Sequence, residues 1–311
     1  MTDLSNSKIA FISSADSRYF PMLLEWVHSV KHSVKNKNFD LCIIDAGLTP
    51  EERKTIEVMV TTVTKPDWPE NMPEHKKGEN EFYKACVCRP FLNKIFPGYD
   101  YYFWMDADTW IQDPSCIDYF FEGASKNKMT LTAAADRAYP KSMRLQWLGR
   151  FPFKAKSFYF SNAKKAFDIK TAKALFPQHN LSAGAFCLHK DAPHWDAWQK
   201  TIIQALQKGK VFTAEQLSLG VIIHLQNLPI EILPAYMHWF CQQDLVWDQE
   251  NKAFVEPYLP HQPIGILHLS GHDQMRIDRS VQIELSDLND QIVKTTYRYP
   301  LYDGEKQQEP S

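Results

Sequence analysis

Short apolar runs alternate with helix-patterned segments along the first half of the chain, and this alternation constrains the fold more than any other feature. Four of the runs have the composition of strands, at 8–13, 39–45, 99–113 and 129–136. Apolar residues recur at helical spacing over 18–34, and Thr49 followed by Pro50 marks the start of a second helix. Such alternation is typical of a mainly parallel sheet with helices on both faces, so we expect an α/β fold.

The pattern continues in the second half of the chain after an interruption. Residues 137–180 mix basic and aromatic side chains, and we expect them to form an insertion or lid over the edge of the sheet. Such side chains suit an anionic ligand, but a solvated lid with its own small core fits equally well. The expected elements beyond it are a strand at 181–189, helices at 193–207 and 214–225, and strands at 230–233 and 264–269.

Proline and charge mark three further segments. The stretch at 61–80 is expected to be a loop, and Pro90 should bend the helix that is expected at 81–96. The polar residues at 303–311 contain no apolar run and are expected to be a frayed tail.

Composition and charge exclude several classes of protein. The formal net charge of the 311 residues is −2, so no global basic field would attract a nucleic acid. No segment approaches the roughly 18 apolar residues of a membrane-spanning helix, and we expect neither such a helix nor a signal peptide. The six cysteines show no framework spacing, so the simplest interpretation is reduced thiols in a cytoplasmic protein.

The sequence Asp106-Ala107-Asp108 carries the strongest chemical signal. It directly follows the run 101–105, which has the composition of a buried strand. Ligands of open α/β sheets bind beyond the carboxyl ends of strands, and side chains two residues apart along a strand point the same way. Two carboxylates so placed suit a hard divalent cation that would stabilise a diphosphate leaving group, whereas solvated turn acids are the alternative.

A second polar cluster, His268 to His272, follows the apolar run 264–267. A histidine at a strand end is often structural, but beside the two aspartates it is a candidate third metal ligand. Gly271 would let backbone amides approach an anion closely. We therefore expect Asp106, Asp108 and His268 to hold Mn²⁺ or Mg²⁺.

Segments spanning residues 8 to about 276 appear in the order found in GT-A-fold glycosyltransferases, and they most resemble glycosyltransferase family eight, which includes bacterial lipopolysaccharide galactosyl- and glucosyltransferases and glycogenin. The resemblance rests on the strand and helix at 9–30, Arg89 ahead of Asp106-Ala107-Asp108, the run ending at Asp136, Leu181-Ser182-Ala183-Gly184, Ala214-Glu215-Gln216 and His268-Leu269-Ser270-Gly271.

The resemblance implies the GT-A fold, a mostly parallel sheet with helices on both faces. It also implies a metal-assisted hexosyltransferase. The implied donor is UDP-glucose or UDP-galactose, and the implied acceptor is a glycan, a lipid-linked saccharide or a protein. Transfer would retain the anomeric configuration. Residues 1–275 would form one catalytic domain, and 276–311 a C-terminal extension with a partly disordered tail.

The resemblance also implies roles for individual residues. Gln216, Glu215 and Asp136 would lie near the transferred sugar. The donor-binding set would comprise Ala15, Asp16, Tyr19, Arg89, Ala107, Ser182, Gly184, Gly271 and His272. Ser182 stands where the family has asparagine, and Glu215 where it has aspartate. The lysine that clamps phosphate in the family is missing, and His272, Arg276 or Arg279 could replace it.

Two other functions fit parts of the sequence. A degenerate protein that only binds a sugar nucleotide or glycan would explain the missing lysine. A sugar-nucleotide pyrophosphorylase shares this kind of sheet, but its chemistry favours a glycine-rich first loop, whereas 13–18 contains no glycine. The basic patches leave peripheral contact with the inner face of a membrane as an open alternative.

Overall fold

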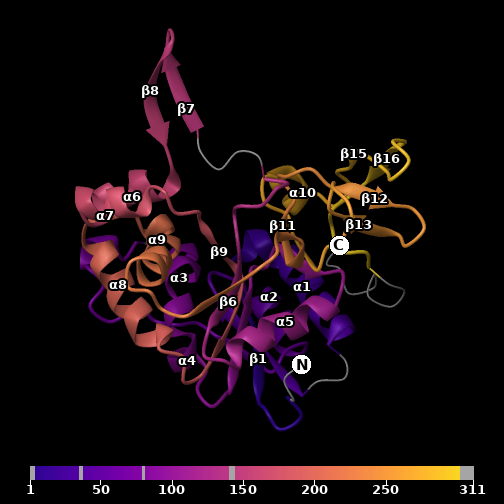
Figure 1. The fold of residues 1–311 in the computed structure, drawn as a ribbon. Helices are drawn as coiled ribbons and strands as arrows, with labels where there is room; N and C mark the ends of the chain where they lie inside the picture. Colours follow the sequence, from indigo (N-terminus) through magenta and orange to yellow (C-terminus); the bar gives the residue numbers. More distant parts are fainter. Residues whose placement is uncertain (1–3, 35–37, 79–80, 140–143, 302–311) are drawn as a thin grey trace.

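The computed structural model describes residues 4–34, 38–78, 81–139 and 144–301, and a seven-stranded sheet forms its centre (Figure 1). The strand order is β10-β6-β9-β4-β1-β2-β3. The bounds are β1 Ile9–Ala15, β2 Phe39–Asp45, β3 Thr62–Thr64, β4 Tyr101–Met105, β6 Met129–Ala133, β9 Leu181–His189 and β10 Ile230–Leu233. All neighbouring pairs are parallel except those of β9, which runs antiparallel to β4 and β6. The expected mostly parallel α/β sheet is confirmed.

A smaller three-stranded sheet continues from the end of β4. It pairs β14, Ile266–His268, with β5, Thr109–Ile111, on one side and with β11, His238–Phe240, on the other. The antiparallel register of β14 and β5 sets His268 opposite Thr109, the residue after Asp108. The strand expected at 264–269 therefore exists, and its pairing brings the second polar cluster to the first.

The helices follow most of the sequence expectations. Thr49 caps α2, Pro50–Glu57, through a capping box with Glu52. The segment at 81–96 breaks at Arg89-Pro90, as expected, into α3, Phe82–Val87, and α4, Leu92–Ile95. The remaining long helices are α1 Phe20–Ser33, α5 Ser115–Ala124, α8 His194–Lys208 and α9 Val211–His224. The segment 61–80 is mostly loop but also contributes β3 to the edge of the sheet.

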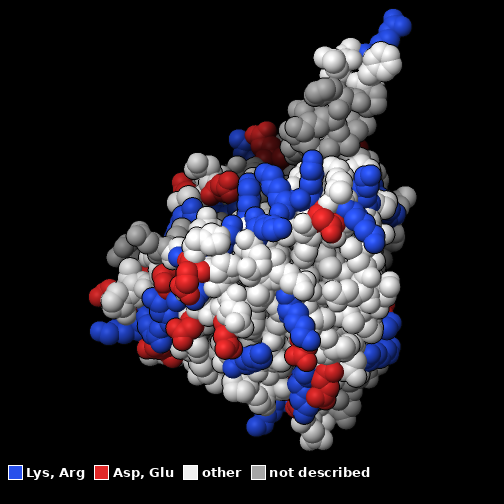
Figure 2. All heavy atoms as spheres, turned by 90° about the vertical axis from the view of Figure 1, so that its left-hand side faces the viewer, with Lys and Arg blue, Asp and Glu red and all other residues white. Residues whose placement is uncertain are grey.

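The insertion at 137–180 contains a hairpin and two helices. The hairpin strands are β7, Arg144–Leu148, and β8, Phe151–Lys156, and the helices are α6, Phe158–Ala166, and α7, Ile169–Leu175. The helices pack beside α8 and α9, whereas the hairpin projects from the body of the protein (Figures 1 and 2).

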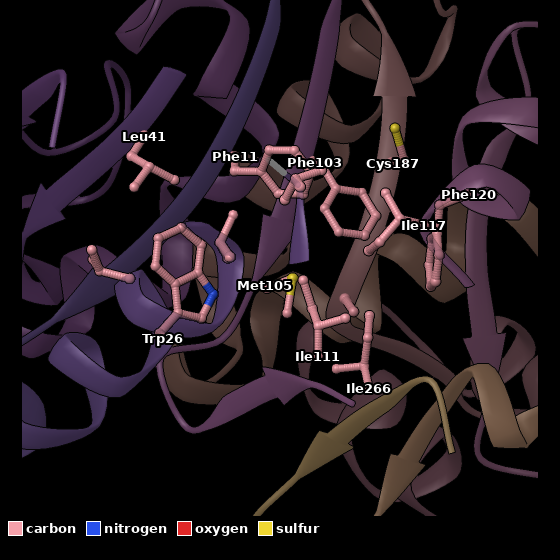
Figure 3. Close-up of a cluster of buried hydrophobic side chains, with 14 of the residues drawn as sticks. Phe11, Trp26, Leu41, Phe103, Met105, Ile111, Ile117, Phe120, Cys187 and Ile266 are labelled. Atoms are coloured by element: carbon pink, nitrogen blue, oxygen red, sulfur yellow. The ribbon is translucent and has the colours of Figure 1, made fainter. Parts of the chain in front are cut away.

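Alternate residues of the central strands face two separate cores. Phe11 and Phe103 belong to the core under α1 and α5, where Trp26 and Phe120 also pack (Figure 3). The next residue along β4, Trp104, faces the opposite core under α8 and α9. Both faces of β4 are therefore covered, which explains its unbroken apolar sequence.

The C-terminal segment up to residue 301 packs against the rest of the protein. Its buried Arg298 donates to Glu25 of α1, and Arg279 donates to the same carboxylate. The expected tail at 303–311 lies outside the described residues. All six cysteines are buried and free. None of the described helices combines the length and apolar composition needed to cross a bilayer.

Candidate functional site

A cavity of about 340 Å³ opens where β1 and β4 end and β9 begins. The carboxyl ends of parallel strands meet at this edge, so loops from distant parts of the chain converge there. Its lining includes most of the residues selected from sequence, namely Ala15, Asp16, Tyr19, Arg89, Asp106, Ala107, Asp108, Ser182, Gly184, Glu215, Gln216 and His268.

Asp106, Asp108 and His268 converge on one wall of this cavity. One potential ligand atom from each lies within 4.8 Å of the others. His268 Nε2 is 3.4 Å from Asp108 Oδ1 and 4.0 Å from Asp106 Oδ2. Gly184 makes this approach feasible, because a Cβ at that position would lie 2.8 Å from His268 Cε1.

The two carboxylates are held in place by different neighbours. The Trp104 indole N–H donates to Asp106 Oδ1 at 2.8 Å, and Arg89 donates to the same oxygen. Burial alone would raise the pKa of Asp108, but His268 and Arg276 outweigh burial and hold this pKa below its usual range. The Asp108 carboxylate is therefore ready to bind a cation in the ionised form.

A second histidine, His238, contacts the ring nitrogen of His268 that does not face the aspartates. It is fully buried, and its Nε2 lies 3.1 Å from His268 Nδ1, with the rings 16° from parallel. Burial lowers the pKa of His238, so this ring is neutral. In the tautomer that coordinates metal through His268 Nε2, the Nδ1–H donates to His238, which donates onward to Thr132 Oγ1 at 3.2 Å.

We expect the substitution His238→Phe to weaken Mn²⁺ binding by about 10- to 100-fold, because it keeps the ring volume but removes the acceptor that orients His268. Calorimetric titration with Mn²⁺ measures this change. His194→Phe is the matched control, since His194 is also fully buried but bonds the Pro229 carbonyl instead. Equal Mn²⁺ affinity of His238→Phe and the wild type would show that His238 has no orienting role.

Arg89 forms an ion pair with the buried Glu215 directly beside Asp106. The Arg89 guanidinium donates to Glu215 and to Asp106, and it lies over the Trp104 ring at 4.7 Å. Burial raises the pKa of Glu215 to about 7, against the opposing effect of Arg89. Glu215 Oε1 and Arg89 Nε have no hydrogen-bond partner among the described residues, so both have capacity left for a polar ligand.

Arg276, in α10 (Asp273–Ile277), is one of the three candidates to replace the missing lysine, and it lines the cavity. It contacts Asp108 Oδ2 at 2.6 Å, and its buried Nε has no partner among the described residues. The other two candidates for the missing lysine are engaged elsewhere, because Arg279 bonds Glu25 and His272 bonds the Cys241 carbonyl.

Three residues selected from sequence lie outside the cavity lining. Asp136 accepts a hydrogen bond from the Ala138 amide at 2.9 Å in the turn after β6, and Gly271 and His272 lie beyond β14. Gln216 does line the cavity, and its amide donates to the Leu181 carbonyl at 2.9 Å. The catalytic and donor-binding roles of all these residues remain predictions.

Several residues that line or support the cavity were not among those expected from the sequence. Phe158, Phe212 and Phe240 border the cavity from three separate segments, and His238 lies behind it. Phe158 belongs to the basic and aromatic insertion expected at 137–180, but no local pattern distinguishes Phe212, Phe240 or His238. Phe240 pairs with His268 through the register of β11 and β14, which only the tertiary structure reveals.

No protein-family model and no curated protein sequence matches the chain. Solved structures do share its fold. One is described as the bifunctional glycosyltransferase WbbM, with a TM-score of 0.55 and 13% identity over 87% of this chain, which spans 47% of WbbM. A galactosyltransferase, LgtC, in complex with donor and acceptor sugar analogues has a TM-score of 0.53 and 12% identity, covering 84% of this chain and 87% of LgtC. An active-site mutant of LgtC matches equally well. The chain therefore has the GT-A fold.

Proposed function

We propose that this GT-A chain is a metal-dependent hexosyltransferase that uses a nucleotide diphosphate sugar, UDP-glucose or UDP-galactose, and transfers the sugar to a hydroxyl group of a glycan, lipid-linked saccharide or protein. The observation that carries the proposal is the convergence of Asp106, Asp108 and His268 in a cavity that Arg89 and Arg276 also line. WbbM and LgtC, which share the fold, are glycosyltransferases, and this supports the reaction class.

The donor atoms of this wall fit a divalent cation. Two carboxylates and one imidazole suit Mn²⁺, and the carboxylates with water ligands suit Mg²⁺. Bound there, the cation would offset the negative charge that develops on the leaving diphosphate. Arg276, which lines the same cavity, would add positive charge for the diphosphate.

We expect Arg276→Ala to weaken UDP binding in the presence of Mn²⁺ by about 10- to 100-fold, the range for loss of a charge-assisted hydrogen bond. Arg276→Lys should recover part of the affinity, because it restores the charge without the fork geometry. Arg18→Ala is the control, since Arg18 lies against the same Tyr19 ring but does not line the cavity. Calorimetry with UDP would contradict the clamp if Arg276→Ala and Arg18→Ala bound equally well.

The acids of the cavity favour retention of configuration. Asp106 and Asp108 are assigned to the metal, Glu215 pairs with Arg89, and Asp16 accepts from the Tyr19 amide. Among the described lining residues none is then a dedicated base for the acceptor, so we infer that a leaving phosphate oxygen takes the acceptor proton on the same face. Gln216, oriented by the Leu181 carbonyl, would stabilise the charge developing at the anomeric carbon. Proton NMR of the first product tests this, and an inverted product would promote Glu215 to general base.

Hydrolysis of a panel of sugar nucleotides with and without Mn²⁺ tests the proposed function. The proposal predicts slow, Mn²⁺-dependent release of UDP from UDP-glucose or UDP-galactose, with less turnover of GDP- and ADP-sugars. Binding without any turnover would indicate a degenerate binding protein. Formation of UTP from a UDP-sugar and pyrophosphate would indicate a pyrophosphorylase.

A further inference from the structure

The hairpin of β7 and β8 is separate from the main sheet of the protein. Its strands form a two-stranded sheet of their own, in which Leu148 pairs with Phe151. Gly149 and Arg150 make the turn, and Gly149 adopts a φ of 58°, which a two-residue hairpin turn favours. The hairpin projects well away from α6 and α7 (Figure 1). Isolated two-stranded hairpins are only marginally stable in water, so a contact at the tip would stabilise this one.

The tip of the hairpin is apolar. Trp147, Leu148 and Phe151 are 61%, 68% and 76% exposed, and they surround the turn together with Arg150. Exposed apolar side chains are common singly, but here three of them flank one projecting turn. An amphipathic tryptophan beside leucine, phenylalanine and arginine is the composition that favours the boundary between lipid headgroups and acyl chains.

Basic residues predominate in the sequence around the hairpin. Residues 137–167 include eight lysines and arginines and no aspartate or glutamate. Exposed lysines continue over the helices at the base of the hairpin, at 164, 165, 170, 173, 208 and 210. Figure 2 shows blue side chains gathered below the hairpin. This distribution complements an anionic surface.

The dimensions agree with a surface contact. A strand rises about 3.3 Å per residue, so the tip lies about 20 Å beyond the base of β8. Interfacial segments insert about 5–10 Å, which would leave the basal lysines about 10–15 Å above the headgroups. That separation is one to two Debye lengths at physiological ionic strength, so their attraction is partly screened but not lost.

We propose that the hairpin at 144–156 anchors the protein to an anionic lipid bilayer, with Trp147, Leu148 and Phe151 inserted and the basic residues facing the headgroups. The tip is too small for a stable protein interface, which buries about 800 Å² per partner. A soluble acidic glycan would offer the leucine and phenylalanine no apolar phase. Only Ser157 separates β8 from Phe158, which lines the cavity, so the anchored hairpin would hold the cavity entrance near the membrane.

Flotation with vesicles tests the proposal without any assay of activity. Wild-type protein should bind vesicles of phosphatidylglycerol and phosphatidylcholine more tightly than pure phosphatidylcholine vesicles. The triple variant Trp147→Ser, Leu148→Ser, Phe151→Ser should bind the mixed vesicles at least about 100-fold more weakly, since it removes the three apolar side chains that would insert into the bilayer. The control variant Val58→Ser, Tyr119→Ser, Ile292→Ser removes exposed apolar residues elsewhere and should bind like the wild type.

Three outcomes would overturn the proposal. One is failure of the wild type to bind the mixed vesicles. The second is binding that high salt abolishes and the triple variant retains, because the lysines alone would then be sufficient. The third is a wild-type oligomer, detected by size-exclusion chromatography, that the triple variant converts to a monomer without any vesicle binding, which would make a second copy of the chain the partner.

Discussion

Replacing Asp108 by alanine is expected to abolish metal-dependent binding of UDP while the protein stays folded. Asp108 provides one of the three candidate ligands. Because it is only 6% exposed, solvent cannot readily replace its carboxylate in the variant. Loss of a direct ligand should exceed the roughly 10- to 100-fold effect of losing an outer partner, so we expect more than about 100-fold weaker binding. Calorimetric titration of UDP with Mn²⁺ present measures it.

Asp100→Ala provides the matched control for this experiment. Asp100 lies at the other end of β4, where it accepts from the Lys8 amide and pairs with Lys190. The control should bind UDP and Mn²⁺ like the wild type, and circular dichroism should show both variants folded. Unchanged UDP affinity in Asp108→Ala would remove Asp108 from the metal site.

The second large effect concerns stability. We expect Arg89→Met to lower the free energy of unfolding by about 3–5 kcal/mol at pH 8, because it leaves the buried Glu215 carboxylate and Asp106 without their shared cation. Urea denaturation in EDTA measures the change in metal-free protein. The loss should shrink at pH 5, since Glu215, whose pKa burial already raises to about 7, is then protonated and needs no partner.

A double variant distinguishes this electrostatic cost from lost packing. Adding Glu215→Gln to Arg89→Met removes the uncompensated charge, so part of the stability should return at pH 8 and little at pH 5. If Arg89→Met were within about 1 kcal/mol of the wild type at both pH values, the ion pair would not be a structural element of the cavity.

The local patterns of the sequence predict where helices and strands lie better than they predict which strands pair and in which direction. The strands at 39–45 and 230–233 and the cap at Thr49 agree with the structure, because each depends on neighbouring residues alone. The antiparallel direction of β9 had no local signal. It depends on how the chain returns to the sheet after the insertion at 137–180.

In the candidate site, too, local signals were visible in the sequence, whereas contacts between distant segments were not. Asp106-Ala107-Asp108 is a local signal, so the sequence was sufficient to select it. His238 lies 30 residues from His268 and 130 from Asp108, and the contact depends on β14 pairing with both β5 and β11. The choice of Arg276 over Arg279 likewise depended on Glu25, a helix residue more than 250 positions away, which binds Arg279 instead.

Anomalous diffraction from crystals grown with UDP and Mn²⁺ would show directly whether these three residues bind a metal ion. We expect one strong manganese peak in contact with Asp106, Asp108 and His268, with the diphosphate of UDP beside the ion and near Arg276. UDP bound in the cavity with no manganese at these three residues, or manganese bound elsewhere, would contradict a metal-dependent transferase site at the end of β4.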